Sequence, residues 1–372
     1  MKIGILTNYN GPNYGAMLQA WSLWKTLQDK GHEVVFLKSI WNLHWYVPLW
    51  KCCYGWNFHG MRSKARDHFR YPITDFSRML PETEPLRDFE KHAAIAKELD
   101  AVIVGSDQVW NPRWVLPWLD IQFLGFVPDT CRRIAYAASF AVEEWGDMKR
   151  NEVARLLNRF DAISVREKSG EGIVRSLADV KVKTVLDPVL LHDSEFFRPL
   201  VSVTDDCSIR KVFTYFAGFT SAACERQCVA ALLKLFPDAC HVSDKTPVGG
   251  PIFSKLFTRI GVNGAISVSD WLGEISRASF VLTDSFHGTA CSVLFHRPFA
   301  VRLFDDTNRG MNERLHSLLE LVGLHNRIFT DSSIDDLRRI AATPIDWDLV
   351  ENRLSKLRAD SISFLENALG IV

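Results

Sequence analysis

A short segment around residue 285 constrains the fold of this chain more than any other stretch. Residues 280–282 form an apolar run that is long enough for one buried strand, and polar residues follow it directly. Apolar residues return beyond Gly288 at helical spacing, at positions 290, 293 and 294. The pattern predicts a strand, a tight turn and a helix. Open α/β sheets bind their ligands at such turns, beyond the carboxyl ends of parallel strands.

Four residues of this turn are suited to an anionic ligand: Asp284, Ser285, His287 and Gly288. His287 falls near the first helical turn, where free backbone N–H groups and the positive end of the helix dipole favour phosphate or carboxylate. We therefore expect a binding or catalytic site here. The alternative is that Asp284 and Ser285 only cap the helix.

Length, charge and cysteine usage narrow the class of protein. A chain of 372 residues favours two domains over a single core. The 44 basic residues are balanced by 44 acidic ones, which argues against a nucleic-acid-binding protein. The eight cysteines contain no pair of C-x-x-C units, so we expect no zinc site. Eight scattered cysteines are a modest number for this length, so we expect them to be reduced thiols in a cytosolic protein.

The amino-terminal residues favour a cytoplasmic location. Residues 1–7 are predicted to be a buried strand and not a secretion signal, because polar residues follow at once. No uninterrupted run of 18 apolar residues occurs, so no membrane-spanning helix is expected.

The chain opens with a strand–helix–strand pattern typical of α/β folds. The loop after the first strand lacks the G-x-G-x-x-G and P-loop patterns, so nicotinamide and nucleoside-triphosphate binding are not expected. It still places the backbone amides of Asn13, Tyr14 and Gly15 at a helix start. The predicted elements are a strand at 3–6, a loop at 7–15, a helix from Ala16 to Gly31 and a strand at 33–37.

Polar residues also follow the strand predicted at 101–104. Asp107 is a candidate base, and Trp110 is a candidate surface on which a sugar could stack. The alternative is that Asp107 only ties the turn. Ser106 and Asn111 belong to the same candidate site.

Two more predicted strands end in polar residues: 134–138 at Ser139, and 162–165 at Arg166. Arg166 could pair with a phosphate or, with equal weight, form a structural ion pair with Asp187. A helix is predicted to follow it at 168–177.

Residues 40–72 interrupt the alternation of strands and helices with four tryptophans among basic residues. The main interpretation is an inserted helical pair that packs its tryptophans on the domain. Contact of residues 41–56 with a membrane surface is an alternative, as is an aromatic lid or sugar platform.

The second half repeats the alternation after a polar linker at 201–208, and a Gly-rich loop at 248–264 carries Lys255 and Arg259. A long helix at 347–369 is expected to pack across the domain junction. The predicted units are residues 1–200, residues 201–345 and a terminal helix at 346–372. Two such α/β halves are expected to face each other across a cleft.

Six motifs in this order resemble the polysaccharide pyruvyl transferase family, over residues 1 to about 330. They are NYGAMLQA at 13–20, GSDQVWN at 105–111, IAYAAS at 134–139, SVRE at 164–167, DPVLL at 187–191 and TDSFHGT at 283–289. The resemblance implies two Rossmann-like domains in a GT-B-like arrangement, with residues 1–200 on the acceptor side and residues 201–345 on the donor side. It also implies transfer of a pyruvyl group from phosphoenolpyruvate to two sugar hydroxyls, giving a cyclic ketal without a metal or cofactor.

For such a reaction, His287 suits the acid or base role, because an unperturbed imidazole titrates near neutral pH. Asp107 is the candidate base or anchor for the acceptor, and Arg166 and Arg309 are candidate clamps on phosphate and carboxylate. Amides at Asn13, Tyr14, Gly15 and the His287 helix start would add neutral donors. Substrate contacts are also expected from Ser106, Trp110, Asn111, Ser139, Asp284, Ser285 and Gly288.

One position departs from the family pattern. Many members carry Arg-Leu-His where this chain has Ser285-Phe286-His287, and the arginine would hold the donor's phosphate or carboxylate. Arg166, Lys255, Arg259 and Arg309 are the candidates to replace it.

The resemblance implies a sugar acceptor, which could be lipid-linked, in surface-polysaccharide assembly. A cytoplasmic protein with peripheral contact at the inner membrane surface through residues 41–56 is then expected. Two other functions remain open: a transferase that uses a nucleotide-sugar donor, and a non-catalytic scaffold of a polysaccharide assembly.

Overall fold

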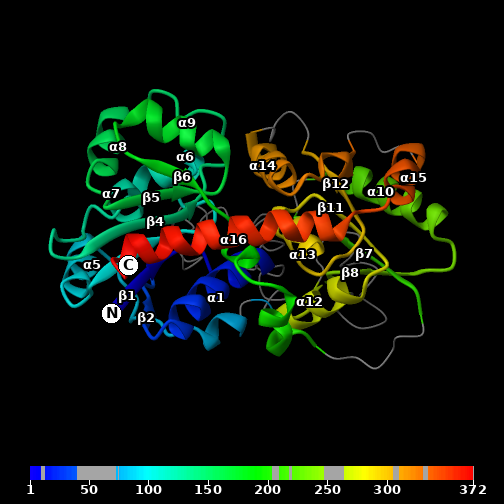
Figure 1. The fold of residues 1–372 in the computed structure, drawn as a ribbon, viewed down its shortest axis with the longest axis horizontal. Coiled ribbons are helices and arrows are strands. Elements are labelled where there is room, and N and C mark those ends of the chain that lie inside the picture. Colours follow the sequence, from blue (N-terminus) through cyan, green and yellow to red (C-terminus); the bar gives the residue numbers. More distant parts are fainter. Residues whose placement is uncertain are drawn as a thin grey trace, which may run out of the picture.

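A computed structural model of the chain shows two α/β halves side by side, with the final helix running across both (Figure 1). The structure describes residues 1–9, 13–39, 73, 75–202, 209–217, 220–246, 264–304, 310–329 and 334–371. The tryptophan-rich segment 41–56, residues 203–208 of the linker predicted at 201–208, and most of the Gly-rich loop lie outside these residues.

The first half is built on a six-stranded parallel sheet with the order β2-β1-β3-β4-β5-β6. The strand order reverses between β1 and β3, so the loops after these two strands run to opposite sides of the sheet. Open α/β sheets bind their ligands in the crevice that such a reversal leaves. The strands are β1 (Lys2–Leu6), β2 (Glu33–Phe36), β3 (Ala101–Val104), β4 (Arg132–Ala138), β5 (Ala162–Val165) and β6 (Val182–Thr184).

The second half contains a five-stranded parallel sheet with the order β13-β12-β11-β7-β8. Its order reverses between β7 and β11, and the predicted central strand is β11. The strands are β7 (Lys211–Tyr215), β8 (Cys240–Ser243), β11 (Phe280–Thr283), β12 (Phe299–Arg302) and β13 (Ile328–Phe329). A short antiparallel pair, β9 (Lys245–Thr246) and β10 (Gly264–Ala265), lies beside it.

Helices cover both sheets, and local capping residues set several of their starts. Asn13 caps the first helix by accepting a hydrogen bond from Ala16 N at 3.2 Å, so this helix begins at Tyr14 and not at Ala16 as expected. The helices of the first half are α1 (Tyr14–Asp29), α5 (Phe89–Ala96), α6 (Pro112–Val115), α7 (Leu119–Gln122), α8 (Arg150–Leu157) and α9 (Lys168–Leu177). Short 3-10 turns lie at η2 (Asp75–Met79), η3 (Leu116–Trp118), η4 (Pro188–Leu190) and η5 (Ser194–Leu200).

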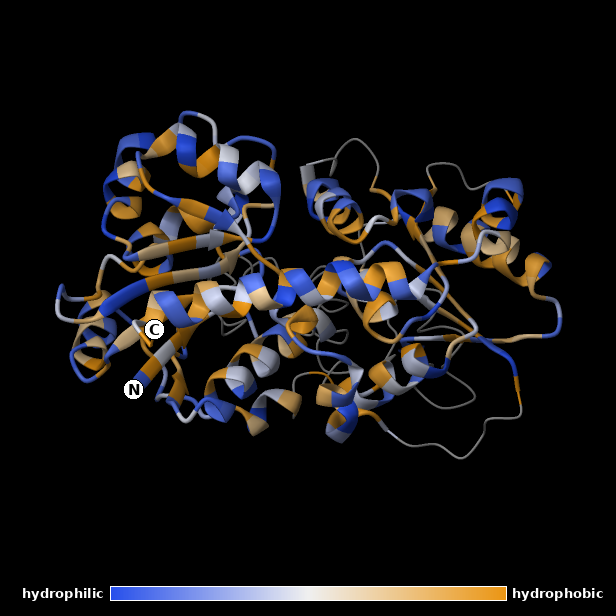
Figure 2. Cartoon of the chain, viewed as in Figure 1, coloured by the Kyte–Doolittle hydropathy of each residue, from blue (hydrophilic) through white to orange (hydrophobic). Residues whose placement is uncertain are grey.

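The second half carries α10 (Ala222–Leu235), α12 (Val268–Arg277), α13 (Phe286–Leu294), α14 (Glu313–Val322), the turn η7 (His325–Arg327) and α15 (Ile334–Ala342). The last helix, α16 (Trp347–Leu369), bridges the halves. Near its start Trp347 stacks on His296 of the second half, and near its end Ala368 O accepts a hydrogen bond from Arg132 of the first. Hydrophobic and hydrophilic residues alternate along it (Figure 2), and its buried face carries Val350, Leu354 and Leu365.

The halves share one hydrophobic core. The largest cluster of buried apolar residues includes Leu190 of the first half, Trp271 and Leu315 of the second, and Leu354 of α16. Separate clusters lie within each half. None of the described helices is both long and apolar enough to cross a membrane.

Candidate functional site

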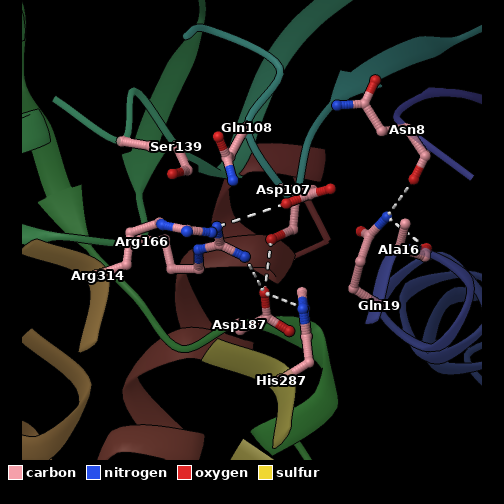
Figure 3. Close-up of polar contacts among 12 residues, drawn as sticks. Asn8, Ala16, Gln19, Asp107, Gln108, Ser139, Arg166, Asp187, His287 and Arg314 are labelled. Atoms are coloured by element: carbon pink, nitrogen blue, oxygen red, sulfur yellow. Dashed lines mark hydrogen bonds and ion pairs between the residues drawn. The ribbon is translucent and has the colours of Figure 1, made fainter. Parts of the chain in front are cut away.

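The carboxyl ends of both sheets meet at the junction of the halves, and polar side chains from both gather there (Figure 3). The loops after β3 and β5 and the turn η4 contribute Asp107, Arg166 and Asp187. The second half contributes His287 from α13 and Arg314 from α14. The structure therefore brings His287 and Asp107 to one place, linked through Arg166 and Asp187.

His287 lies in the first turn of α13, which Ser285 caps by accepting a hydrogen bond from Gly288 N at 3.3 Å. The residue is 5% exposed, and its ring packs against the start of α1 in the other half. A Cβ added at Gly15 would lie 1.9 Å from His287 Nδ1, so only glycine allows this approach. Nε2 lies 3.5 Å from Asp187 Oδ2.

Asp187 is the central acceptor of the cluster. Its Oδ2 accepts hydrogen bonds from Ser106 Oγ at 2.9 Å and Arg166 Nη1 at 2.8 Å, and its Oδ1 accepts one from Val189 N at 3.1 Å. Burial alone would raise the pKa of Asp187, but His287 and Arg166 outweigh it and hold the pKa below its ordinary value. The carboxylate is therefore ionised where it faces His287.

The backbone of the adjacent peptide holds Asp187 in place. Leu186 N donates a hydrogen bond to Ser361 Oγ of α16 at 3.0 Å, and Leu186 O accepts one from Tyr136 OH at 3.2 Å. Residues from three separate elements thus fix this carboxylate before any ligand arrives.

Asp107 follows β3 in a left-handed backbone conformation, with φ of 67°. Aspartate tolerates this region better than most residues do. Its carbonyl accepts hydrogen bonds from Val109 N at 2.8 Å and Ser139 N at 2.9 Å, so the backbone of Asp107 ties the turn. Its carboxylate remains available and lies 3.6 Å from Arg166 Nη2.

Arg166 is buried among acids and one aromatic ring. Besides Asp187, its guanidinium lies 4.2 Å from the centre of the Phe286 ring and 3.9 Å from Glu167 Oε2. Burial acts to lower the pKa of Arg166, but Asp187, Asp107 and Glu167 together raise it above its ordinary value. The structural ion pair with Asp187 is therefore present, and Arg166 still has Nε and Nη2 without a hydrogen-bond partner among the described residues.

The sequence analysis missed Arg314 and Gln19, and it considered Asp187 only as a partner of Arg166. Arg314 is 6% exposed beside Arg166. Gln19 donates from Nε2 to Thr7 Oγ1, Asn8 O and Ala16 O, while its buried Oε1 has no hydrogen-bond partner in the described part of the chain. The Asp-Pro pair at 187–188 was a signal for a fixed turn, but only tertiary packing reveals what its carboxylate faces.

Several buried polar atoms at this junction lack a hydrogen-bond partner among the residues described: His287 Nε2, Arg166 Nε and Nη2, Gln19 Oε1 and Glu167 Oε2. An unpaired buried donor or acceptor costs about 1–3 kcal/mol. Native proteins keep few of them, and they mark sites where a ligand or water supplies the partner. The cluster can hold a small, polar, anionic molecule; no group of three or more metal-ligating side chains is found in the described part of the chain.

Trp110 is a correction to the predicted sugar platform. Its side chain is fully buried in the first half, stacked on Phe123 with ring centres 4.8 Å apart, and Nε1 donates to Gln122 O. Asn111 caps α6 and donates to Gln108 Oε1. The aromatic ring is large and apolar, so burying it in the core is more favourable than exposing it to a sugar site.

Asp284 is a second correction, because its oxygens serve the loop after β7. They accept hydrogen bonds from Ala217 N at 2.7 Å and Thr220 Oγ1 at 2.6 Å, and burial raises the pKa of Asp284. Of the two capping candidates, Ser285 alone caps α13. Gly288 serves close packing, because a Cβ there would lie 2.5 Å from Thr283 Oγ1.

Tyr14 connects the two halves and does not face the cluster. Its hydroxyl donates to Ile266 O at 3.0 Å, and its ring stacks on Trp271 with centres 5.0 Å apart. Ser139 Oγ donates to Glu167 Oε1 at 3.0 Å. Ser106 and Ser139 are fully buried, and their hydroxyls donate hydrogen bonds to Asp187 and Glu167. Arg309, Lys255 and Arg259 lie outside the described residues.

Comparisons with known proteins agree with this architecture. The family model described as polysaccharide pyruvyl transferase matches residues 13–302. No curated protein sequence matches the chain.

Among solved structures, MnaA of S. aureus with UDP is similar at 12% identity and a TM-score of 0.52, over 100% of this chain and 97% of that chain. The glycotransferase of kitacinnamycin has 12% identity and a TM-score of 0.50 over 99% of each chain. UGT89C1 of Arabidopsis thaliana also has 12% identity and a TM-score of 0.50, over 100% of this chain and 98% of its own. At such identities the likeness shows the fold alone, a GT-B-like arrangement, and confirms the predicted fold class.

Proposed function

The chain belongs to the polysaccharide pyruvyl transferase family, and we propose that it transfers the pyruvyl group of phosphoenolpyruvate to two hydroxyls of a sugar, forming a cyclic ketal. The observation that carries the proposal is the junction cluster, where His287 from one half meets Asp187, Arg166 and Asp107 from the other. It offers an imidazole for proton transfer, cations for an anionic donor and a carboxylate for a hydroxyl.

The proposed reaction balances without a redox partner or metal. A proton adds to the vinyl carbon of the donor, which becomes a methyl group, and the adjacent carbon becomes an oxocarbenium. One sugar hydroxyl adds to this carbon and loses its proton. The bond to the phosphate oxygen then breaks, and the second hydroxyl adds and loses its proton. Of the two hydroxyl protons, one balances the new methyl hydrogen and the other leaves with inorganic phosphate.

His287 is proposed as the group that exchanges protons with the donor and hydroxyls. Its environment fits this role, because the ionised carboxylate of Asp187 lies 3.5 Å from Nε2 and orients the ring. Asp107, 3.6 Å from Arg166, is proposed to accept a hydrogen bond from the acceptor sugar. The first-turn amides of α1 and α13, around Gly15 and His287, would support negative charge.

The acceptor is proposed to be a sugar intermediate of surface-polysaccharide assembly, with a lipid-linked form as one option. Cytoplasmic location and peripheral membrane contact through residues 41–56 belong to the same proposal. That segment lies outside the described residues, so the proposal rests there on its tryptophan-rich composition alone.

Replacement of His287 by alanine tests the proposal. We expect a loss of roughly 100- to 10,000-fold in phosphate release and ketal formation, the usual contribution of a positioned acid or base. The assay supplies phosphoenolpyruvate with a panel of acceptor sugars and detects the ketal by mass spectrometry. His325→Ala, which removes an exposed histidine, is the matched control and should retain full activity. Near-normal ketal formation by His287→Ala would contradict the assignment, and absence of product with every acceptor would favour a non-catalytic role.

A further inference from the structure

Arg314 is a buried cation whose hydrogen-bonding capacity is largely unused. It is the second residue of α14, and its Nε donates to Met311 O at 3.3 Å. Its two terminal nitrogens donate to none of the described residues, although the side chain is 6% exposed. An arginine is rarely buried unless a partner satisfies it.

Among the described residues no acid forms a hydrogen bond or an ion pair with Arg314, and two acids of the junction, Asp187 and Glu167, have partners of their own. Asp187 binds Ser106, Arg166 and a backbone amide. Glu167 accepts through Oε1 from Ser139 Oγ, Phe140 N and Ala141 N. These contacts hold Asp187 and Glu167 in the first half, so the two acids balance charge without pairing with Arg314.

Among the described residues, a second arginine, Arg166, lies beside Arg314. Figure 3 shows the guanidinium groups of Arg314 and Arg166 side by side, with Asp107 and Gln108 next to them. Burial, aided by the charge of Arg166, lowers the pKa of Arg314 to about 10. Asp107, Glu167 and Asp187 offset part of the repulsion between the two cations, but none of these acids makes an ion pair with Arg314. Arg166 also keeps Nε and Nη2 unpartnered within the described residues.

We infer that Arg314 and Arg166 form a two-arginine clamp for the phosphate or carboxylate of the donor, and that Arg314 supplies the cation missing at position 285. The inference rests on the proposed function for the identity of the donor. Phe286, which also departs from the family pattern, lies under Arg166 with its ring centre 4.2 Å away and orients that guanidinium. A cation that the family takes from the start of α13 would thus come from α14.

Isothermal titration of the full chain with phosphoenolpyruvate, inorganic phosphate and pyruvate tests the clamp. In Arg314→Gln, we expect affinity for the anions that the wild type binds to fall roughly 10- to 100-fold, because a charge-assisted hydrogen-bond donor is lost. Arg314→Lys keeps the charge without the forked geometry and should be intermediate. The matched control is Arg338→Gln, which removes an exposed arginine paired with Asp335.

Thermal unfolding separates a clamp from a structural role. Without ligand, Arg314→Gln should unfold at or above the wild-type temperature, because it removes a repelled buried charge. With phosphoenolpyruvate, it should show less of the ligand-induced rise. A large fall in unfolding temperature with unchanged affinity would overturn the clamp. A double variant tests whether Arg314 replaces the arginine missing at position 285. Adding Ser285→Arg to Arg314→Gln should restore anion affinity, because it returns a cation to the position it has in the family. If the double variant binds the anions as weakly as Arg314→Gln alone, Arg314 does not replace that arginine.

The outcomes distinguish the clamp from the proposed function. If wild type and Arg314→Gln bind phosphoenolpyruvate with equal affinity, the clamp is wrong, but the proposed ketal-forming activity is not affected. Wild-type binding of phosphate without phosphoenolpyruvate turnover overturns the donor assignment, and the clamp stands if Arg314→Gln weakens phosphate binding. If the wild type binds none of the three anions, the clamp is wrong.

Discussion

At the scale of single residues, the site depends on the absence of a side chain at Gly15. His287 Nδ1 would lie 1.9 Å from a Cβ at this position, closer than any two such atoms can approach. We predict that Gly15→Ala displaces the imidazole from Asp187 and lowers turnover at least 10-fold, with a loss of about 1–3 kcal/mol in unfolding free energy from overpacking. Steady-state kinetics and urea unfolding measure the two effects.

The matched control for Gly15→Ala is Gly172→Ala in α9, where an added Cβ meets nothing within 4 Å. That change should leave turnover intact and stabilise by about 1 kcal/mol, the helix propensity gain of alanine over glycine. Wild-type turnover in Gly15→Ala would show that the position of His287 against α1 is not needed for the chemistry.

Residue types at strand ends could be predicted from the sequence, but their roles could not. Polar residues after β3, β5 and β11 indicated one ligand site, and Asp107, Arg166 and His287 do lie together. Trp110 and Asp284 have the same kind of position, yet one fills the core and the other ties a loop. The difference depends on the direction of each side chain, which a pattern of residue types does not contain.

At the scale of elements, the loops after β7 and β11 are joined through one buried carboxyl group, Asp284. Its pKa is raised in the folded state by burial, so its stabilising contribution is complete below pH 3.8 and is lost as pH rises through the folded value. We predict that Asp284→Asn, which does not titrate, gains stability relative to wild type as pH rises from 3.8 toward neutrality. The other ionisable groups cancel in this difference.

Urea unfolding of wild type and Asp284→Asn at a series of pH values measures this gain. The amide oxygen can still accept from Ala217 N, and the amide nitrogen can donate to Thr220 Oγ1, so the ties survive. A stability difference that stays constant across the pH series would mean that Asp284 has no shifted titration.

Helices and strands could be predicted from the sequence where the spacing of apolar residues and the capping residues indicated the same element. The strand–turn–helix at 278–290 is β11 and α13, and the helix expected at 168–177 is α9 with the same bounds. Asp187 and Arg314 were not predicted as site residues, because only tertiary packing brings Asp187 to His287 and Arg314 to Arg166.

At the scale of the whole molecule, the halves are joined at the site and also away from it. Tyr14 of α1 binds the second half through Ile266 O, and α16 contacts both halves, with Ser361 holding the peptide before Asp187. The same interactions that join the halves therefore position the carboxylate that faces His287. The boundaries at 200 and 345 remain predictions, and residues 203–208 of the linker predicted at 201–208 lie outside the described residues.

The central claim is that one small anionic donor is bound by side chains of both halves at once. A crystal structure of the protein with phosphoenolpyruvate tests it most directly. The account predicts the donor between His287 and Arg314 of the second half and Arg166 of the first, with an anionic group on the two arginines. Phosphoenolpyruvate bound to one half alone, or away from His287, would contradict it.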